Sequence, residues 1–229
     1  MLDIAANCRR ILERIAEAAV RCGREPGEIK LLAATKSQSV EKIRAAINAG
    51  IRLFGENYVQ EAKAKRAQIS DPVEWHMIGH LQRNKVKAAL DLFSLIESLD
   101  SLELARALDR EGKKRGEIAR CFIEVNLGGE ETKSGIAKDE VRWLLEEVSH
   151  LSSIRVEGLM VIPPFRERPE DMRPYFRELR EFQMELRGLE LPNADLRELS
   201  MGMTHDFPVA IEEGATLVRI GTAIFGPRE

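Results

Sequence analysis

One lysine in this chain of 229 residues stands where a reactive amine could be used. Lys36 directly follows the apolar run LLAAT at residues 31–35, which contains no carboxylate that could pair with the amine. A lysine amine in a desolvated site loses its charge more readily and can attack a carbonyl carbon, forming a Schiff base. Because most lysines are solvated surface groups, the position alone marks Lys36 as a candidate nucleophile and no more.

A second set of candidate residues follows two apolar runs near the C-terminus. The stretches are SMGM at 200–203 and RIGT at 219–222, which supply hydroxyls, flexible glycines and one cation. A short helix is predicted to start at Thr222, and helix N-termini bind phosphate well. In the alternative interpretation, Gly221 only serves a tight turn and Ser200 caps the following helix. The pattern thus indicates a candidate phosphate site.

An amine and a phosphate site together predict a ligand that carries both a carbonyl group and a phosphate. Pyridoxal 5′-phosphate (PLP) is one such molecule, and the substrate of a lysine-dependent aldolase is another. The residues themselves leave these two alternatives open.

Other reactive residues form weaker patterns. His76 and His80 lie in and just after the apolar run at 74–79, but no third metal ligand is evident nearby. We therefore expect no metal site and a structural role for His76. Lys133, in the loop sequence GGEETKSG, is either a second aldehyde acceptor or, as we expect, an exposed solvated lysine. Neither an H-E-x-x-H pattern nor a nucleophile elbow occurs.

Eight short apolar runs alternate with amphipathic stretches along almost the whole chain. Such continuous runs are typical of parallel strands covered on both faces. The alternation predicts a (β/α)8 barrel of the TIM type, formed by residues 1–229 as a single domain. A doubly wound sheet usually carries a Gly-rich first turn, and neither G-x-G-x-x-G nor G-x-x-x-x-G-K-[ST] occurs. The predicted strands are 31–35, 51–55, 74–79, 92–98, 120–127, 154–162, 196–202 and 216–221.

The amphipathic stretches predict helices around this barrel. An extra N-terminal helix should pack outside it, with four apolar side chains on one face: Cys8, Ile11, Leu12 and Ile15. Ser39 is a predicted N-cap, and Asp100 with Glu103 a predicted capping box. The longest helix is predicted from about Pro169 to Arg187. In barrels of this kind, functional residues follow the C-terminal ends of the strands, where the candidates above lie.

Composition and charge exclude several classes of protein. The net charge is −3, with basic and acidic residues interleaved, so a nucleic acid is not an expected partner. No apolar run approaches the ~20 residues that span a membrane. Three scattered cysteines, Cys8, Cys22 and Cys121, are typical of reduced thiols and predict a cytoplasmic protein. We expect a monomer, because no long exposed apolar patch is recognisable.

Seven stretches together resemble the PLP homeostasis protein family, which is similar to the N-terminal barrel domain of bacterial alanine racemase. They are AATK (33–36), FGENYVQE (54–61), WHMIGHLQRNK (75–85), KSGI (133–136), EGLMVI (157–162), LSMGMTHDFPVAIEEG (199–214) and VRIGTAIFG (218–226). The resemblance extends over essentially the whole chain. It implies that the ligand is PLP, bound covalently to a lysine as a Schiff base.

The resemblance also implies cofactor-binding residues. The matched positions are Lys36 for the PLP lysine, Arg219 near the pyridine nitrogen, Ser200, Gly221 and Thr222 for the phosphate, and Asn57 and His80 at the border of the pocket. The implied function is intracellular PLP homeostasis, in which the chain binds, buffers and delivers the cofactor. PLP-dependent apo-enzymes would be the recipients.

A PLP-dependent racemase is the alternative to such a carrier. Racemisation needs proton-transfer groups on both faces of the cofactor. In the racemases that this chain resembles, the second group is a tyrosine of a further β-rich domain. The sequence ends at Glu229, soon after the last predicted strand, so we expect that domain to be missing. A cation such as Arg219 also keeps the ring nitrogen unprotonated and weakens the ring as an electron sink. We therefore expect no catalytic activity.

Overall fold

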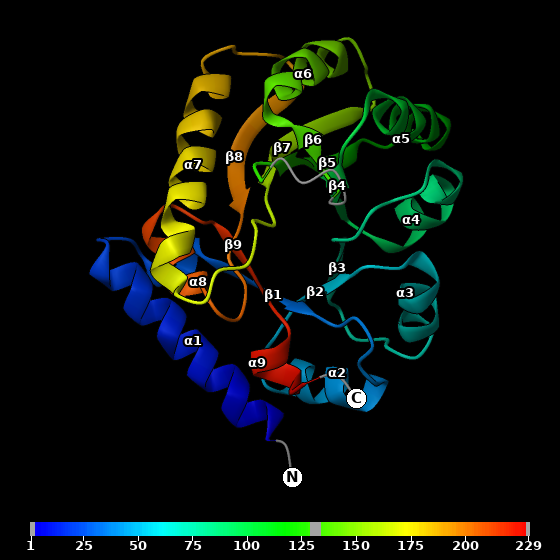
Figure 1. Cartoon of the computed structure of the whole chain (residues 1–229). Coiled ribbons are helices and arrows are strands. Elements are labelled where there is room, and N and C mark those ends of the chain that lie inside the picture. The colour runs from blue at the N-terminus through cyan, green and yellow to red at the C-terminus, as the bar shows by residue number, and fades with distance from the viewer. Residues whose placement is uncertain (1–2, 129–133, 228–229) are drawn as a thin grey trace.

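Eight parallel strands close into a barrel in the computed structural model, which describes residues 3–128 and 134–227 (Figure 1). They are β1 (Lys30–Ala34), β2 (Leu53–Glu56), β3 (Glu74–Met77), β4 (Leu95–Leu99), β5 (Ala119–Asn126), β7 (Ile154–Met160), β8 (Ala194–Ser200) and β9 (Leu217–Ile220). β1 pairs with β2 and β9, and β4 pairs with β5, which closes the ladder. A short strand β6 (Ile136–Ala137) adds to β5. The predicted barrel is confirmed, and each barrel strand overlaps one predicted run.

Helices surround this barrel (Figure 1). They are α1 (Ile4–Arg21), α2 (Val40–Asn48), α3 (Val59–Arg66), α4 (Val86–Leu92), α5 (Leu102–Arg115), α6 (Val141–Ser149), α7 (Arg173–Arg187), α8 (Phe207–Glu212) and α9 (Thr222–Phe225). The N-terminal helix α1 lies outside the barrel against α2, α8 and α9, as predicted. In residues 3–128 and 134–227, no helix is long and apolar enough to cross a membrane.

The predicted faces and lengths of the helices are confirmed only in part. In α1, Cys8, Ile11 and Ile15 are buried, but Leu12 is 43% exposed. Leu12 lies at the edge of the buried face, where it borders a cavity under the barrel. The helix predicted from Pro169 begins as a 3₁₀ turn, and its α-helical part, α7, is shorter than α1.

One of the two predicted caps is wrong. Ser39 caps α2, because its hydroxyl accepts a hydrogen bond from the Lys42 N–H at 3.4 Å. At α5 the N-cap residue is Ser101, and no side chain caps the helix there. The carboxylate of Asp100 instead lies 2.9 Å from Nδ1 of His80. This contact to the imidazole replaces the predicted capping box.

The barrel interior contains an apolar layer between its two open ends. Its buried members are Leu32, Ile78, Leu95, Phe122, Met160 and Leu217. A much larger apolar cluster lies between the strands and the surrounding helices. The cavities at the two ends share no lining residue. Each mouth of the barrel can therefore hold its own set of polar groups.

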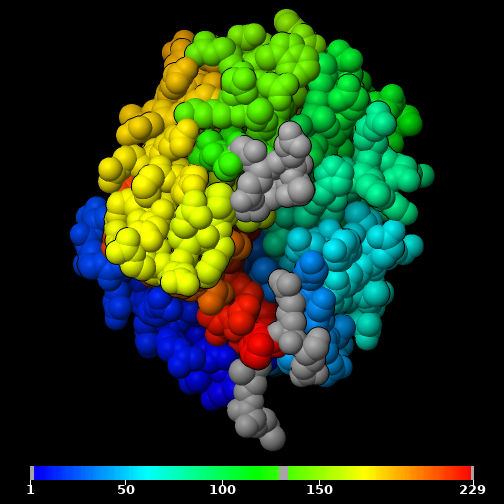
Figure 2. Space-filling model, in the orientation of Figure 1, coloured from blue at the N-terminus to red at the C-terminus, as the bar shows by residue number. Residues whose placement is uncertain are grey.

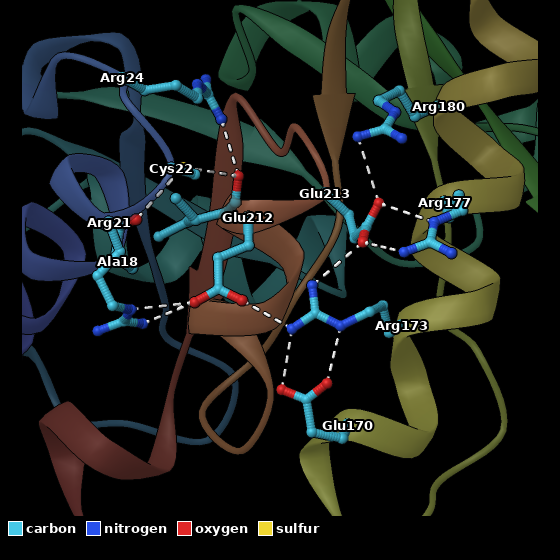
Figure 3. A network of polar contacts seen from close by, with 11 residues as sticks. Ala18, Arg21, Cys22, Arg24, Glu170, Arg173, Arg177, Arg180, Glu212 and Glu213 are labelled. Atoms are coloured by element: carbon cyan, nitrogen blue, oxygen red, sulfur yellow. Dashed lines mark hydrogen bonds and ion pairs between the residues drawn. The ribbon is translucent and has the colours of Figure 1, made fainter.

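Arginines and glutamates tie α1, α7 and α8 together outside the barrel (Figure 3). Arg173 donates to Glu212 at 2.7 Å and to Glu213 at 3.1 Å. Arg21 donates to Glu212 from α1, and Arg177 donates to Glu213 from α7. Burial alone would raise the pKa of Glu213, but hydrogen bonds from Arg177 and Arg173 outweigh it and lower that pKa. The charged carboxylates thus hold α8 in place just before β9.

Candidate functional site

The C-terminal ends of the strands surround a pocket of about 350 Å³. Five of the seven predicted cofactor-binding residues line it: Lys36, Asn57, Arg219, Gly221 and Thr222. They come from the ends of β1, β2 and β9, which are neighbours in the barrel. Figure 2 shows this face hollowed at its centre, between α9 in red and the yellow segment that leads into α7. The fold therefore brings residues that are far apart in sequence to one cavity.

Lys36 lies two residues beyond β1 and is half-buried. Its Nζ atom is 5.1 Å from the centre of the Tyr58 ring, within the range of a cation–π contact. The described residues that line the pocket include no Asp and no Glu. No carboxylate of this wall neutralises the Lys36 amine, which is therefore available to a ligand.

Arg219 is the second cation of the pocket and is only 4% exposed. Its guanidinium donates one hydrogen bond to the Val161 carbonyl at 2.8 Å and another to the Ser200 hydroxyl. Burial lowers the pKa of Arg219, although Glu97 and Glu124 oppose this shift. An arginine side chain stays protonated in proteins. The pocket therefore has a fixed positive charge whose orientation is set by two hydrogen bonds.

The structure does not bring Ser200 to the pocket. Ser200 is the last residue of β8 and is fully buried, with its hydroxyl donating to Glu97 at 2.5 Å and accepting from Arg219. The other carboxylate oxygen of Glu97 lies 2.7 Å from Nδ1 of the buried His76. Ser200 thus belongs to a buried polar chain, His76–Glu97–Ser200–Arg219, inside the barrel. In this position it supports Arg219.

A hydroxyl missed in the sequence, that of Thr204, lines the pocket beside Gly221 and Thr222. Thr204 Oγ1 accepts a hydrogen bond from the Ala223 N–H at 3.4 Å, at the start of α9. The signal was present in the sequence, because Thr204 follows Gly202 in the stretch already singled out. The backbone of Gly202 has φ +90°, and a Cβ there would lie 2.5 Å from the Ala210 side chain. A tight glycine turn therefore carries the chain from the end of β8 to Thr204.

The remaining predicted residues lie around the pocket or outside it. Asn57 is shared with a neighbouring hollow, which His80 lines instead of the main pocket. His205 lines the main pocket, and its Nε2 lies 2.9 Å from the Glu167 carbonyl oxygen. Lys133 falls outside the described residues. His80 is therefore at the border that the sequence predicted, and His205 is an additional titratable group at the site.

Buried acids lie on the interior side of Arg219. Glu97 is fully buried and Glu124 is 4% exposed, and both interact electrostatically with Arg219. Burial raises the pKa of Glu124 to about 7, while Arg219 acts in the opposite direction. Within the described ranges, no group of three His, Cys, Asp or Glu side chains is arranged to hold a metal ion. The charge of Arg219 is thus balanced by buried acids, and none of the described residues that line the pocket is a carboxylate partner for it.

Comparisons with known proteins agree with this geometry. Residues 4–229 match the family model of the alanine racemase N-terminal domain. A pyridoxal phosphate homeostasis protein of Aquifex aeolicus is 48% identical over 229 residues, which is 100% of both chains. A pyridoxal phosphate homeostasis protein of Pseudomonas aeruginosa is 41% identical over 231 residues, and the match covers 100% of this chain and 97% of the relative.

The solved structure of PipY of Synechococcus elongatus with PLP bound is also similar, with a TM-score of 0.82 and 38% identity. The match covers 94% of this chain and 100% of PipY. The motifs, the barrel and the full-length relatives agree, and the chain belongs to the pyridoxal phosphate homeostasis protein family, built on the alanine racemase N-terminal domain.

Proposed function

We propose that this chain binds PLP in the pocket at the C-terminal mouth of the barrel and carries it without catalysing a reaction. The observation that carries the proposal is that Lys36, Arg219, Gly221 and Thr222 line one pocket whose described wall contains no carboxylate. PipY, a full-length relative, has been solved with PLP bound. In this proposal residues 1–229 act as one domain, a cytoplasmic monomer that delivers PLP to apo-enzymes.

The pocket residues fit this cofactor. A phosphate dianion needs cations, hydroxyls or free backbone N–H groups, and the pocket offers Thr204, Thr222 and the first turn of α9. A Cβ at Gly221 would lie 3.3 Å from the Ala34 carbonyl oxygen. The glycine therefore lets the end of β9 lie close to the end of β1 in the pocket wall. Lys36 supplies the amine that an aldehyde requires, and Arg219 supplies a donor for the ring nitrogen.

When bound, PLP supplies an aldehyde carbon that can form a C=N bond to an amine with loss of one water molecule. The Lys36 amine is the group that we propose for this covalent bond. The Thr204 and Thr222 hydroxyls donate to the phosphate, and Arg219 donates to the ring nitrogen through its fixed guanidinium. Asn57 completes the wall beside Lys36, and His80 borders it from the next hollow. We assign Ser200 an indirect role, through the Arg219 contact.

A carrier is favoured over an enzyme for two reasons. A cation at the ring nitrogen disfavours protonation there, which weakens the ring as an electron sink. The relatives above are also named as homeostasis proteins. One observation favours the alternative, a racemase-like enzyme: His205 lines the same pocket as Lys36 and could serve as a second proton-transfer group. Its Nε2 is bonded to the Glu167 carbonyl, which limits that use.

Covalent labelling tests the binding proposal. The purified chain is mixed with PLP, its visible spectrum is recorded, and the adduct is reduced with borohydride and mapped by peptide mass spectrometry. We expect a single label on Lys36. A label that falls mainly on Lys133, or no label at all, would overturn the assignment.

Turnover assays test the absence of catalysis. The PLP-loaded chain is given a broad panel of amino acids in racemase, transaminase and lyase assays. We expect no sustained turnover. Turnover that disappears in both Lys36→Ala and His205→Ala would promote the racemase-like alternative, whereas a rate that survives both substitutions would reveal a contaminant.

A further inference from the structure

Lys65 of α3 is buried below the end of β1, although lysines are rarely buried unless they are paired. It is 6% exposed, whereas Lys63 and Arg66 on the same helix are exposed to solvent. Burial of an ammonium group is unfavourable unless hydrogen bonds compensate for the lost water. The position of Lys65 therefore depends on specific acceptors.

The Lys65 ammonium has three such acceptors. Its Nζ donates to the Thr35 carbonyl oxygen, to Oε1 of Glu56 and to Oε1 of Glu61, each at 2.6 Å. A lysine ammonium has three N–H donors and no acceptor, so its capacity is filled. Glu56, at the end of β2, is fully buried. The ammonium thus joins β1, β2 and α3.

These acceptors connect to the chain on both sides of Lys36. Thr35, which precedes it, accepts from Lys65 through its carbonyl, and its hydroxyl donates to Glu56 at 2.6 Å. Ser37, which follows it, donates its N–H to Glu61 at 2.6 Å. Both neighbours of Lys36 are therefore bonded to the Lys65 cluster.

The backbone at Ser37 shows why such support is needed. Ser37 has φ +61°, in the left-handed region that residues other than glycine rarely adopt. The Gln38 N–H closes the turn by donating to the Thr35 carbonyl at 2.9 Å. A conformation of this kind persists only where surrounding contacts determine it. The bond from Ser37 to Glu61 and the bond from Lys65 to Thr35 are those contacts.

The cluster is not optimised for stability alone. Glu56 Oε2 is buried and has no hydrogen-bond partner in the described part of the chain. A buried ion pair can often be replaced by apolar residues of similar volume without loss of stability, so its presence is weak evidence for a stabilising role. A contribution to stability does not explain why the cluster is bonded to both chain neighbours of Lys36, Thr35 and Ser37.

We propose that Lys65 is a positioning residue, which holds the Thr35–Ser37 segment so that the Lys36 amine faces the pocket. The inference rests on the proposed function, in which Lys36 binds the aldehyde of PLP. It predicts that loss of Lys65 impairs the reaction of Lys36 more than it impairs recognition of the ring and phosphate.

Two ligands separate these effects. PLP reports formation of the covalent bond through its visible spectrum, while pyridoxine 5′-phosphate has the same ring and phosphate but an alcohol in place of the aldehyde. In Lys65→Met we expect adduct formation to be roughly tenfold to 100-fold slower, the effect of misplacing a reacting group by about 1 Å. Affinity for pyridoxine 5′-phosphate should be unchanged. Lys63→Met, an exposed lysine on the same helix, is the matched control and should behave as the unmodified chain.

Several results would overturn the inference. An unchanged adduct rate in folded Lys65→Met would do so. An equal loss of PLP adduct formation and of affinity for pyridoxine 5′-phosphate would do so too, because it would indicate general damage to the pocket. If Lys65→Met does not fold, Glu61→Ala decides the matter, because it removes the Ser37 acceptor at a partly exposed position: an unchanged adduct rate there rejects the inference. Failure of the unmodified chain to form any adduct would instead reject the proposed function.

Discussion

The two ends of β1 each present a lysine, and the two lysines have opposite surroundings. At the N-terminal mouth of the barrel, Lys30 lies 2.5 Å from Glu198, and nearby Arg120 donates two hydrogen bonds to Glu157. At the C-terminal mouth, Lys36 faces a pocket that has no carboxylate among its described lining residues. The same strand therefore carries one neutralised lysine and one available lysine.

Pocket volume does not identify the candidate site, because a hollow lined by His80 and Asp100 measures about 770 Å³. The cavity at the N-terminal mouth is also larger than the candidate pocket, about 500 Å³ against about 350 Å³. Two of its cations, Lys30 and Arg120, are paired with acids of the same wall, so an anionic ligand that used them would have to break existing ion pairs. At the other end, Lys36 and Arg219 line a pocket in which no described wall residue is an acid. The lack of acids among its described lining residues, and not its volume, distinguishes the candidate site.

Exchange of the two lysines for alanine is the most direct way to break this comparison. Lys36→Ala should abolish the borohydride-fixed PLP adduct, because it removes the only amine of the described pocket wall. Lys30→Ala should leave the adduct intact, since Lys30 lies at the opposite mouth of the barrel. The yield of reduced adduct, measured by intact mass, gives both results.

A residual adduct on a second lysine in Lys36→Ala would not by itself contradict the assignment, provided that its rate is that of an exposed lysine. Loss of the adduct in Lys30→Ala would contradict it, because the two mouths would then not be independent.

The hydroxyls of the C-terminal mouth provide the next largest effect. We expect the double substitution Thr204→Ala and Thr222→Ala to weaken PLP binding by about 3 to 6 kcal/mol, or roughly 100-fold to 20,000-fold, because it removes two hydrogen bonds to a charged group and each contributes about 1.5 to 3 kcal/mol. Equilibrium titration measures this loss. Affinity for pyridoxal, which has no phosphate, should not change.

Thr216→Ala provides the matched control, because Thr216 precedes β9 at the other mouth, where its hydroxyl donates to Glu198. Equal affinity of the double variant and the unmodified chain for PLP would show that the phosphate binds elsewhere.

The sequence predicted the barrel, and it pointed to several residues that line one pocket, because strands and strand ends depend on local patterns. Continuous apolar runs mark buried parallel strands, and Lys36, Gly221 and Thr222 follow such runs directly. Ser200 and Thr204 show the limit of this approach. Both carry hydroxyls near the end of β8, but the side chain of the last strand residue turns into the barrel, and only the residue beyond the glycine turn reaches the pocket. That distinction depends on three-dimensional geometry.

Contacts between residues that lie far apart along the chain also could not be predicted from the sequence. Asp100 has the spacing of a capping box but pairs with His80, because another strand end places an imidazole beside it. The bonds of Lys65 to Thr35 and Glu56 join residues of three elements. A periodic pattern shows which side chains are buried, but it cannot show which buried polar groups meet.

The acids behind Arg219 predict a pH dependence of stability opposite in sign to that of Glu198 at the N-terminal mouth, whose pKa is lowered by its hydrogen bonds from Lys30 and Thr216. Burial raises the pKa of Glu124 from 4.5 to about 7. The folded chain therefore holds a proton that the unfolded chain releases, and stability falls as pH rises from the lower value through about 7. Glu124→Gln has no such proton to lose. Its free energy of unfolding, relative to that of the unmodified chain, should therefore rise by at most about 3 kcal/mol between pH 4.5 and pH 8. Urea unfolding at several pH values measures the gain, and a constant difference between the two proteins would contradict it.

The smallest expected effect belongs to the paired lysine itself. Lys30 is 53% exposed and its ion pair with Glu198 faces solvent, so Lys30→Ala should lower the free energy of unfolding by only about 0.2 to 1 kcal/mol. High salt should reduce the difference further, because it screens exposed charges. Denaturant unfolding at low and high ionic strength provides the measurement. A loss above about 2 kcal/mol, insensitive to salt, would mean that the N-terminal mouth is organised around Lys30. Both ends of β1 would then carry an organised site, and the availability of Lys36 would no longer distinguish the C-terminal mouth.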